Sequence, residues 1–124
     1  MRHVIQKDEN GCGMACVAML AGVDYETSCK RLFRTKSGKG RYTHTKEIKA
    51  ALRRAGLRTD RRCVRFKKDE GPLILQFDAI MITRAAKQHG TFHWVVWDSK
   101  ARRVLDPDYE ARKRKFSSYL RVYR

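Results

Sequence analysis

Apolar residues recur at helical spacing in the first half of the chain. A run from Cys12 to Ala21 is rich in Ala, Met and Val, and Gly22 follows it. Glycine commonly stands just after a helix, because it adopts the left-handed backbone conformation without steric cost. The pattern therefore predicts a first helix over residues 12–21, with Asn10 or Gly11 at its cap.

Two further helices are predicted after the first. Asp24 is a favourable cap for a second helix, which has Leu32 and Phe33 near its end. Thr45 is the expected cap of a third helix that runs through Ala55 and is ended by Gly56. Apolar positions recur along this third helix and predict one buried face: Ile48, Ala51, Leu52 and Ala55. Between these two helices, the basic stretch over 34–41 contains two glycines and is expected to be a loop.

Short apolar runs predict strands in the second half. The run over 93–97 is strongly β-prone, as is 103–105, and residues 98–102 between them are expected to form a hairpin turn. Further strand candidates are the segments 63–66, 73–77 and 79–83. The charged tail over 109–115 is expected as a basic helix or a loop, before a last apolar patch over 116–123. Helices followed by an antiparallel sheet predict an α+β fold.

The length of the chain indicates the number of domains, and its charge indicates the ligands that its surface attracts. A chain of 124 residues has the size of one domain, so we expect a single domain over residues 1–124. It carries 29 Lys and Arg against 13 Asp and Glu, a formal charge of +16, where about 2–8 suffices for solubility. Such a surface attracts polyanions, and contact with nucleic acid is one hypothesis for it. No aromatic RNA-binding motif and no zinc-finger spacing accompanies the charge.

The start of the chain and the cysteines suggest a location. Residues 1–9 lack the apolar region of a secretion signal, and no apolar run approaches the roughly 20 residues that a membrane span needs. We therefore expect a cytoplasmic protein without a membrane span, with its four cysteines reduced: Cys12, Cys16, Cys29 and Cys63. Because no CxxC pair is present, a zinc ribbon is disfavoured. A structural zinc site on Cys12, Cys16 and two histidines is the alternative.

Cys12 is the first candidate for chemistry. It stands at the predicted start of a helix, where unpaired backbone N–H groups and the helix dipole stabilise a thiolate. Gly11 and Gly13 are expected to leave the thiol open to a substrate carbonyl. The backbone N–H of Cys12 and the side-chain amide of Gln6 are candidate donors to an oxyanion. Core packing is the alternative role for Cys12 and the expected one for Cys16, which could also form a disulfide with it under oxidation.

A thiolate needs a base, and His93 opens a predicted strand. If the segments 93–97 and 103–106 pair as a hairpin, His93 and Asp106 lie side by side at one end of the sheet. Asp106 would then hold the imidazole in the tautomer and orientation that proton transfer requires. Asp106 could instead only begin a turn before Pro107. Weaker alternatives are His89 as the base, and Asp98 or Asp108 as the orienting group.

Four other side chains receive structural interpretations. His3 and His44 are expected at the surface. Trp94 and Trp97 fall on opposite faces of their strand, so one is expected in the core and the other in the substrate cleft.

Three segments carry a resemblance to a known family. Gln6, followed six residues later by Cys12-Gly-Met-Ala-Cys16-Val-Ala-Met, resembles the N-terminal motif of the bacteriocin-processing (double-glycine) cysteine peptidases and their stand-alone relatives. Phe92-His93-Trp-Val-Val and Val-Leu-Asp106-Pro107 are similar to that family's histidine and aspartate motifs, and the match extends from about Ile5 to Tyr109. The resemblance implies a papain-like fold and peptide-bond hydrolysis. By analogy, Cys12 is the nucleophile, His93 the general base and acid, Asp106 the orienting residue and Gln6 an oxyanion-hole donor.

The leading hypothesis is therefore a cysteine peptidase or hydrolase that acts on a peptide or protein substrate. Its acyl-thioenzyme chemistry needs no metal and no cofactor. A second hypothesis is an acyltransferase or a deamidase, because these reactions share the acyl-enzyme and differ only in the acceptor. A third is a non-enzymatic basic module that binds nucleic acid or an acidic protein on the same scaffold.

Overall fold

A computed structural model describes residues 1–36, 43–85, 92–108 and 114–124 of the chain. Three expectations fall wholly or partly outside these ranges: the basic loop over 34–41, His89 as a rival base, and the tail over 109–115. Within the described residues, helices come first along the chain and strands follow, which confirms the α+β class.

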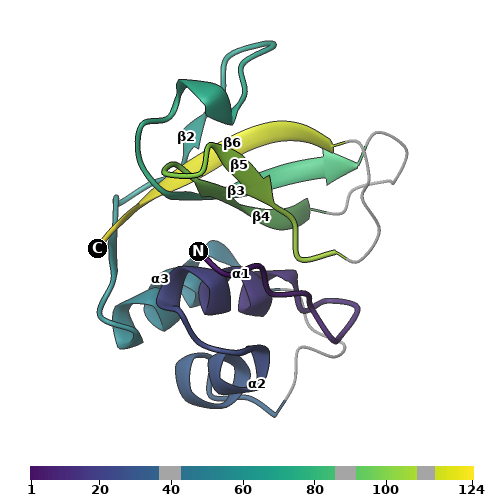
Figure 1. Cartoon of the computed structure of the whole chain (residues 1–124), viewed down its shortest axis with the longest axis vertical. Helices are drawn as coiled ribbons and strands as arrows, with labels where there is room; N and C mark the ends of the chain where they lie inside the picture. Colours follow the sequence, from purple (N-terminus) through teal and green to yellow (C-terminus); the bar gives the residue numbers. More distant parts are fainter. Residues whose placement is uncertain (37–42, 86–91, 109–113) are drawn as a thin grey trace.

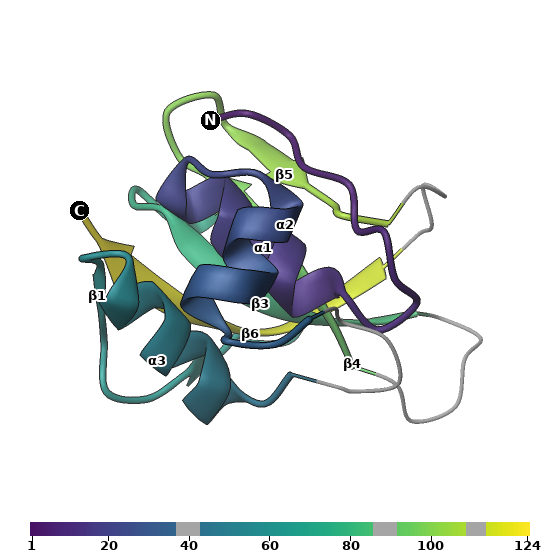
Figure 2. The ribbon, with the colours of Figure 1, turned by 90° about the horizontal axis from the view of Figure 1, so that it is seen from below.

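The helices form one layer and the sheet forms the other (Figure 1). The helical layer contains α1 (Cys12–Ala21), α2 (Tyr25–Thr27) and α3 (Thr45–Arg54), and a π-helical segment, Ser28–Leu32, continues α2. Seen from the helical side, α1 lies across the sheet between the N-terminal segment and α3 (Figure 2). Because α1 packs against β4 (Phe92–Asp98), the start of the helix is brought close to the sheet.

Antiparallel pairing joins the strands in the order β1-β6-β3-β4-β5, and β2 also pairs with β6. The remaining bounds are Arg58–Thr59 (β1), Val64–Arg65 (β2), Ala79–Ala85 (β3), Arg103–Leu105 (β5) and Arg114–Tyr123 (β6). The last strand of the chain, β6, therefore lies inside the sheet between β1 and β3. The sequence predicted only an apolar patch over 116–123, so this long inner strand was missed.

The first two helices begin where the sequence predicted. Gly22 follows α1 with a left-handed backbone (φ 72°), and the Asp24 side chain caps α2 by accepting a backbone hydrogen bond over 2.7 Å. The predicted cap of the third helix is wrong by one residue, because His44 and not Thr45 occupies that position. The reason is local: Glu47 lies three residues after His44 and accepts a hydrogen bond from its backbone N–H over 3.4 Å.

The strongest predicted strands are confirmed. β4 and β5 form the expected hairpin, β3 covers the predicted run over 79–83, and β2 is a shortened form of the run over 63–66. The predicted strand over 73–77 is wrong, since Pro72–Ile74 forms a short 3-10 helix, η2, instead. Pro72 has no N–H to give to a strand, and Leu73 is 68% exposed rather than packed in the sheet.

Two apolar clusters lie on opposite faces of the sheet. Trp94 and Val96 of β4 pack toward the helices, together with Leu20 and Leu52. Val95 and Trp97 pack on the other face against Phe66 and Leu75, which belong to the segment that crosses that face (Figure 1). The two tryptophans thus point to opposite sides, as predicted. Both are buried, although Trp97 is among the residues that line a hollow on its face, and the expectation that one of them lines the substrate cleft stays a prediction.

Candidate active site

Cys12 is the first residue of α1, and hydrogen bonds hold the segment that leads into it. The side-chain amide of Gln6 donates to two backbone carbonyls of this segment, over 3.0 and 2.9 Å. The N–H of Gly11 donates to the Asp8 carbonyl over 3.0 Å, and the Tyr25 hydroxyl donates to the Asp8 carboxylate over 2.6 Å. These contacts place Cys12 at a helix start, where the unpaired N–H groups favour a negative charge.

The two glycines beside Cys12 serve packing rather than access. A Cβ atom on Gly11 would lie 2.0 Å from the Tyr25 hydroxyl, and one on Gly13 would lie 2.8 Å from Cβ of Thr43. Cys12 itself is only 3% exposed. The expectation that these glycines leave the thiol unshielded is therefore wrong, because neighbouring side chains fill the space that the missing Cβ atoms leave.

His93 lies in β4, directly opposite Thr83 of β3. The Thr83 hydroxyl donates to the His93 carbonyl over 3.1 Å, which ties the backbone at this point. A bulge interrupts the pairing of β3 with β6 between Ile82 and Thr83, at the same level of the sheet. Bulges bend a strand and redirect its side chains, so this irregularity adjusts the end of the sheet from which the imidazole projects.

Asp106 follows β5, and its carboxylate meets the imidazole of His93. The Nε2 atom of His93 donates to Oδ1 of Asp106 over 2.7 Å. The backbone N–H of Asp108 donates to the same oxygen over 2.8 Å. The Cys12 thiol is the other group that interacts with this imidazole.

The N-terminal segment fixes the backbone around Asp106. It runs alongside β5 in Figure 2, where the N–H of Gln6 donates to the Pro107 carbonyl over 2.9 Å. The Nε2 atom of His3 donates to the Asp106 carbonyl over 2.5 Å. His3 is exposed, as expected, yet sequence reasoning missed this contact, since nothing local to residue 3 indicates a partner about a hundred residues away.

The surroundings of His93 favour its protonated form. Burial has the largest single effect and opposes protonation. The hydrogen bond to Asp106 and the interactions with Cys12 act in the other direction, and together they raise the pKa of His93 to about 9. An imidazolium next to a thiol stabilises the thiolate, which is the reactive form of cysteine.

The other three cysteines lack such an environment. All four are free thiols. Burial is the main cause that raises the pKa of each of the three thiols, and it acts most strongly on Cys16, which is fully buried in the core. Cys16 is thus the core residue that the sequence predicted, and its thiol is held in the unreactive, protonated form.

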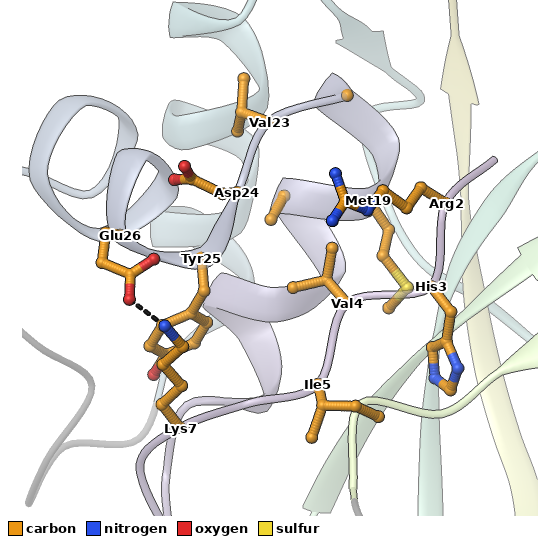
Figure 3. Close-up of a pocket in the computed structure, with 12 residues that line it drawn as sticks. Arg2, His3, Val4, Ile5, Lys7, Met19, Val23, Asp24, Tyr25 and Glu26 are labelled. Carbon is orange, nitrogen blue, oxygen red and sulfur yellow. Dashed lines mark hydrogen bonds and ion pairs between the residues drawn. The ribbon is translucent and has the colours of Figure 1, made fainter.

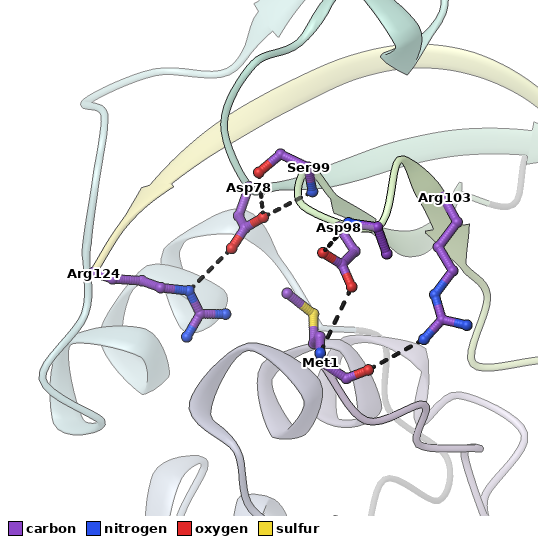
Figure 4. A network of polar contacts seen from close by, with 7 residues as sticks. Met1, Asp78, Asp98, Ser99, Arg103 and Arg124 are labelled. Atoms are coloured by element: carbon purple, nitrogen blue, oxygen red, sulfur yellow. Dashed lines mark hydrogen bonds and ion pairs between the residues drawn. The ribbon is translucent and has the colours of Figure 1, made fainter.

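The alternative orienting residues are occupied elsewhere. Asp98 lies at the β4–β5 turn, where it pairs with the Met1 amino group at 3.7 Å and accepts a hydrogen bond from the turn backbone over 3.2 Å (Figure 4). In the same network, Asp78 binds Ser99 and Arg124, which fixes the turn that leads into β5. Asp108 contributes its backbone to the carboxylate of Asp106, as described above.

A hollow of about 480 Å³ lies between the N-terminal segment and the second half of α1 (Figure 3). Its lining combines apolar side chains such as Val4 and Met19 with the ion pair of Lys7 and Glu26. Cys12, His93 and Asp106 are not among its lining residues. His3 lines this hollow and also reaches Asp106, so it connects the hollow to the candidate site.

Within the described part of the chain, no group of three or more His, Cys, Asp or Glu side chains is arranged to hold a metal ion. Among the described helices, none is both long and apolar enough to cross a membrane.

A helical layer against an antiparallel sheet, with a cysteine at the head of the first helix and a histidine from the sheet beside it, defines the papain-like class of cysteine peptidases. The profile of the Peptidase C39 family matches residues 1–119, nearly the whole chain, and the protein belongs to this family. The resemblance seen in the sequence is thereby confirmed. No curated protein is found to match the chain.

Proposed function

We propose that this protein cleaves a peptide or amide bond by acyl-thioenzyme chemistry, with Cys12 as the nucleophile, His93 as general base and acid, and Asp106 as the orienting residue. The observation that carries this proposal is the position of His93 between two partners. Its Nε2 atom donates to Asp106 over 2.7 Å, and its ring also interacts with the Cys12 thiol.

The chemistry follows from this arrangement. The Cys12 thiolate attacks the substrate carbonyl and forms a tetrahedral oxyanion. The protonated imidazole of His93 then gives its proton to the leaving amine, and an acyl-thioenzyme remains. In the second half of the reaction, His93 takes a proton from water, which attacks the thioester and releases the acid.

Two groups are proposed to stabilise the oxyanion. One is the backbone N–H of Cys12, in the first turn of α1, where helices leave their N–H groups unpaired. The other is the side-chain amide of Gln6, whose two N–H groups donate to the carbonyls of Asp8 and Glu9. For this role, one of these N–H groups must turn from its carbonyl to the oxyanion when substrate binds.

Thiol labelling tests the identity of the nucleophile. Iodoacetamide at neutral pH is expected to label wild-type protein rapidly at one site, and Cys12→Ala should abolish this rapid phase while Cys16→Ala should not. Equal and slow labelling of all four cysteines would contradict the proposal. Product masses with and without an added amine would then separate hydrolysis from acyl transfer, because a transferase makes the amide of that amine.

A further inference from the structure

A second hollow, also of about 480 Å³, lies at the end of the sheet where β3 and β6 meet the segment after β2. Half of its ten lining residues are basic and come from separate parts of the chain: Arg65, Lys67, Lys68, Arg84 and Lys115. Two acidic residues face these five cations. Phe66 and Phe116 also line this hollow, and their rings meet edge to face with 6.2 Å between the ring centroids.

The positive charge of this hollow is only partly offset by the two acidic residues, Asp69 and Glu70. Within the described residues, none of its five basic side chains forms an ion pair. Glu70, one of the two acids, accepts a hydrogen bond from the backbone N–H of Lys67 over 2.7 Å, which holds its carboxylate in the turn and leaves its negative charge in place. Clustered like charges in a concave surface focus the electric field and attract an anionic ligand.

The hollow adjoins the candidate active site. Arg84 on its rim is paired across the strands with Phe92, and its guanidinium lies 5.1 Å from the centre of the Phe92 ring. Phe92 immediately precedes His93, which is paired with the neighbour of Arg84, Thr83. Arg84 and His93 are one register position apart on adjacent strands, so their backbones are neighbours while their side chains leave opposite faces of the sheet. A peptide that reaches both side chains must therefore pass round this end of the sheet.

We propose that this basic hollow binds acidic side chains of a peptide substrate, at a distance from the bond to be cleaved. The inference rests on the proposed peptidase function, because it assigns a substrate class to that site. The peptidase family favours a peptide as the occupant. Phe66 is buried, but Phe92 remains 49% exposed beside Arg84, so nucleic acid is the alternative that the experiment tests.

Binding is measured on the Cys12→Ala protein, so that turnover does not interfere. The probes are fluorescein-labelled hexaglutamate, hexaglutamine and hexathymidylate. The hollow is disrupted by Arg84→Glu with Lys115→Glu, and the matched control, Arg31→Glu with Lys100→Glu, makes the same change of charge at exposed positions outside the hollow. We expect hexaglutamate to bind more tightly than hexaglutamine, with at least a tenfold loss of affinity in the hollow variant and less than a threefold loss in the control.

Two results of this experiment would overturn the inference. Equal losses in both variants would mean that hexaglutamate responds only to net charge. Tighter binding of hexathymidylate than of hexaglutamate, lost in the hollow variant, would assign the hollow to nucleic acid.

Cleavage assays on protein that retains Cys12 separate this inference from the proposed function. On substrates that differ only in flanking Glu or Gln, the hollow variant should lose at least tenfold in kcat/KM for the acidic substrate and little for the neutral one. Equal kcat/KM in variant and wild type would overturn the inference and leave the peptidase standing. Hexaglutamate binding by the hollow without any cleavage by wild-type protein would instead remove the peptidase function and, with it, the substrate assignment.

Discussion

The imidazole of His93 donates from Nε2 to Oδ1 of Asp106 over 2.7 Å, although thirteen positions separate the two residues in the chain. The β4–β5 hairpin brings them together, and the N-terminal segment holds the second partner in place from the other side. With Nε2 engaged by Asp106, Nδ1 is the nitrogen that the proposed mechanism assigns to Cys12.

Replacing Asp106 by Asn should lower activity and change its pH dependence. An amide can present its own N–H to the ring and no longer stabilises the imidazolium, so the pKa of His93 should fall from about 9. We expect kcat/KM to drop roughly 10²–10⁴-fold, the usual contribution of acid–base catalysis. The alkaline limb of the pH profile should move to lower pH. Asp108→Asn is the control, because it contacts Asp106 through its backbone, and an equal shift in that variant would contradict the assignment.

The stability of the fold should depend on the protonation of His93. Its pKa is raised from 6.5 to about 9 in the folded protein, so the protonated side chain stabilises the native state. This contribution is complete below pH 6.5 and is lost as the pH rises through 9. Urea unfolding at pH 6 and pH 9.5 should show a decrease in the free energy of unfolding that is smaller in His93→Gln. The same decrease in both proteins would show that other groups cause it.

The sequence predicted those parts of the fold that depend on local patterns. The glycine after α1, the aspartate before α2 and the apolar run of β4 each carry their own signal. The inner strand β6 was predicted only as an apolar patch, because its place in the sheet depends on pairing with distant strands. The prediction of a strand over 73–77 failed for the opposite reason: four of its five residues are apolar, but Pro72 and the exposure of Leu73 exclude the segment from the sheet.

The candidate site was predictable to a similar degree. The positions of Cys12, His93 and Asp106 followed from a helix start and a hairpin, both of which are local features. The contact of His3 with Asp106 and the stacking of Arg84 on Phe92 depend on tertiary packing and leave no trace in the pattern. The glycines beside Cys12 were recognised in the sequence, but their role was misinterpreted: they make room for Tyr25 and Thr43.

Gly13→Ala should therefore destabilise the protein. Inside a helix, Ala is normally better than Gly by about 0.8–1.0 kcal/mol. Here the added Cβ would lie 2.8 Å from Thr43 and 2.9 Å from Ile48, and overpacking of this kind costs about 1–3 kcal/mol. We expect a net loss of about 1 kcal/mol in urea unfolding. Gly71→Ala is the control, because its Cβ would meet Phe116 at an ordinary 3.8 Å. A Gly13→Ala protein that is more stable than wild type would contradict this prediction, because it would show that Thr43 and Ile48 shift to accommodate the added Cβ.

His3→Ala should lower kcat through Asp106 rather than through substrate binding. Removing the donor to the Asp106 carbonyl costs about 0.5–1.5 kcal/mol, which corresponds to a decrease in kcat of roughly twofold to thirteenfold. KM should change little, and His3→Gln should restore part of kcat because its amide N–H can donate to the same carbonyl. A change confined to KM would place His3 in substrate binding, through the hollow of Figure 3 that it also lines.

Gln6→Ala separates an oxyanion-hole donor from a residue that only shapes the loop before α1. Loss of one oxyanion donor lowers kcat by about 10²–10³-fold. Alkylation by iodoacetamide depends on the thiolate and forms no oxyanion, so the rate of Cys12 labelling should stay unchanged in this variant. The same side chain also donates to the Asp8 and Glu9 carbonyls, and loosening of that loop would displace Cys12 itself. Labelling and hydrolysis would then fall together, which would assign Gln6 to structure alone.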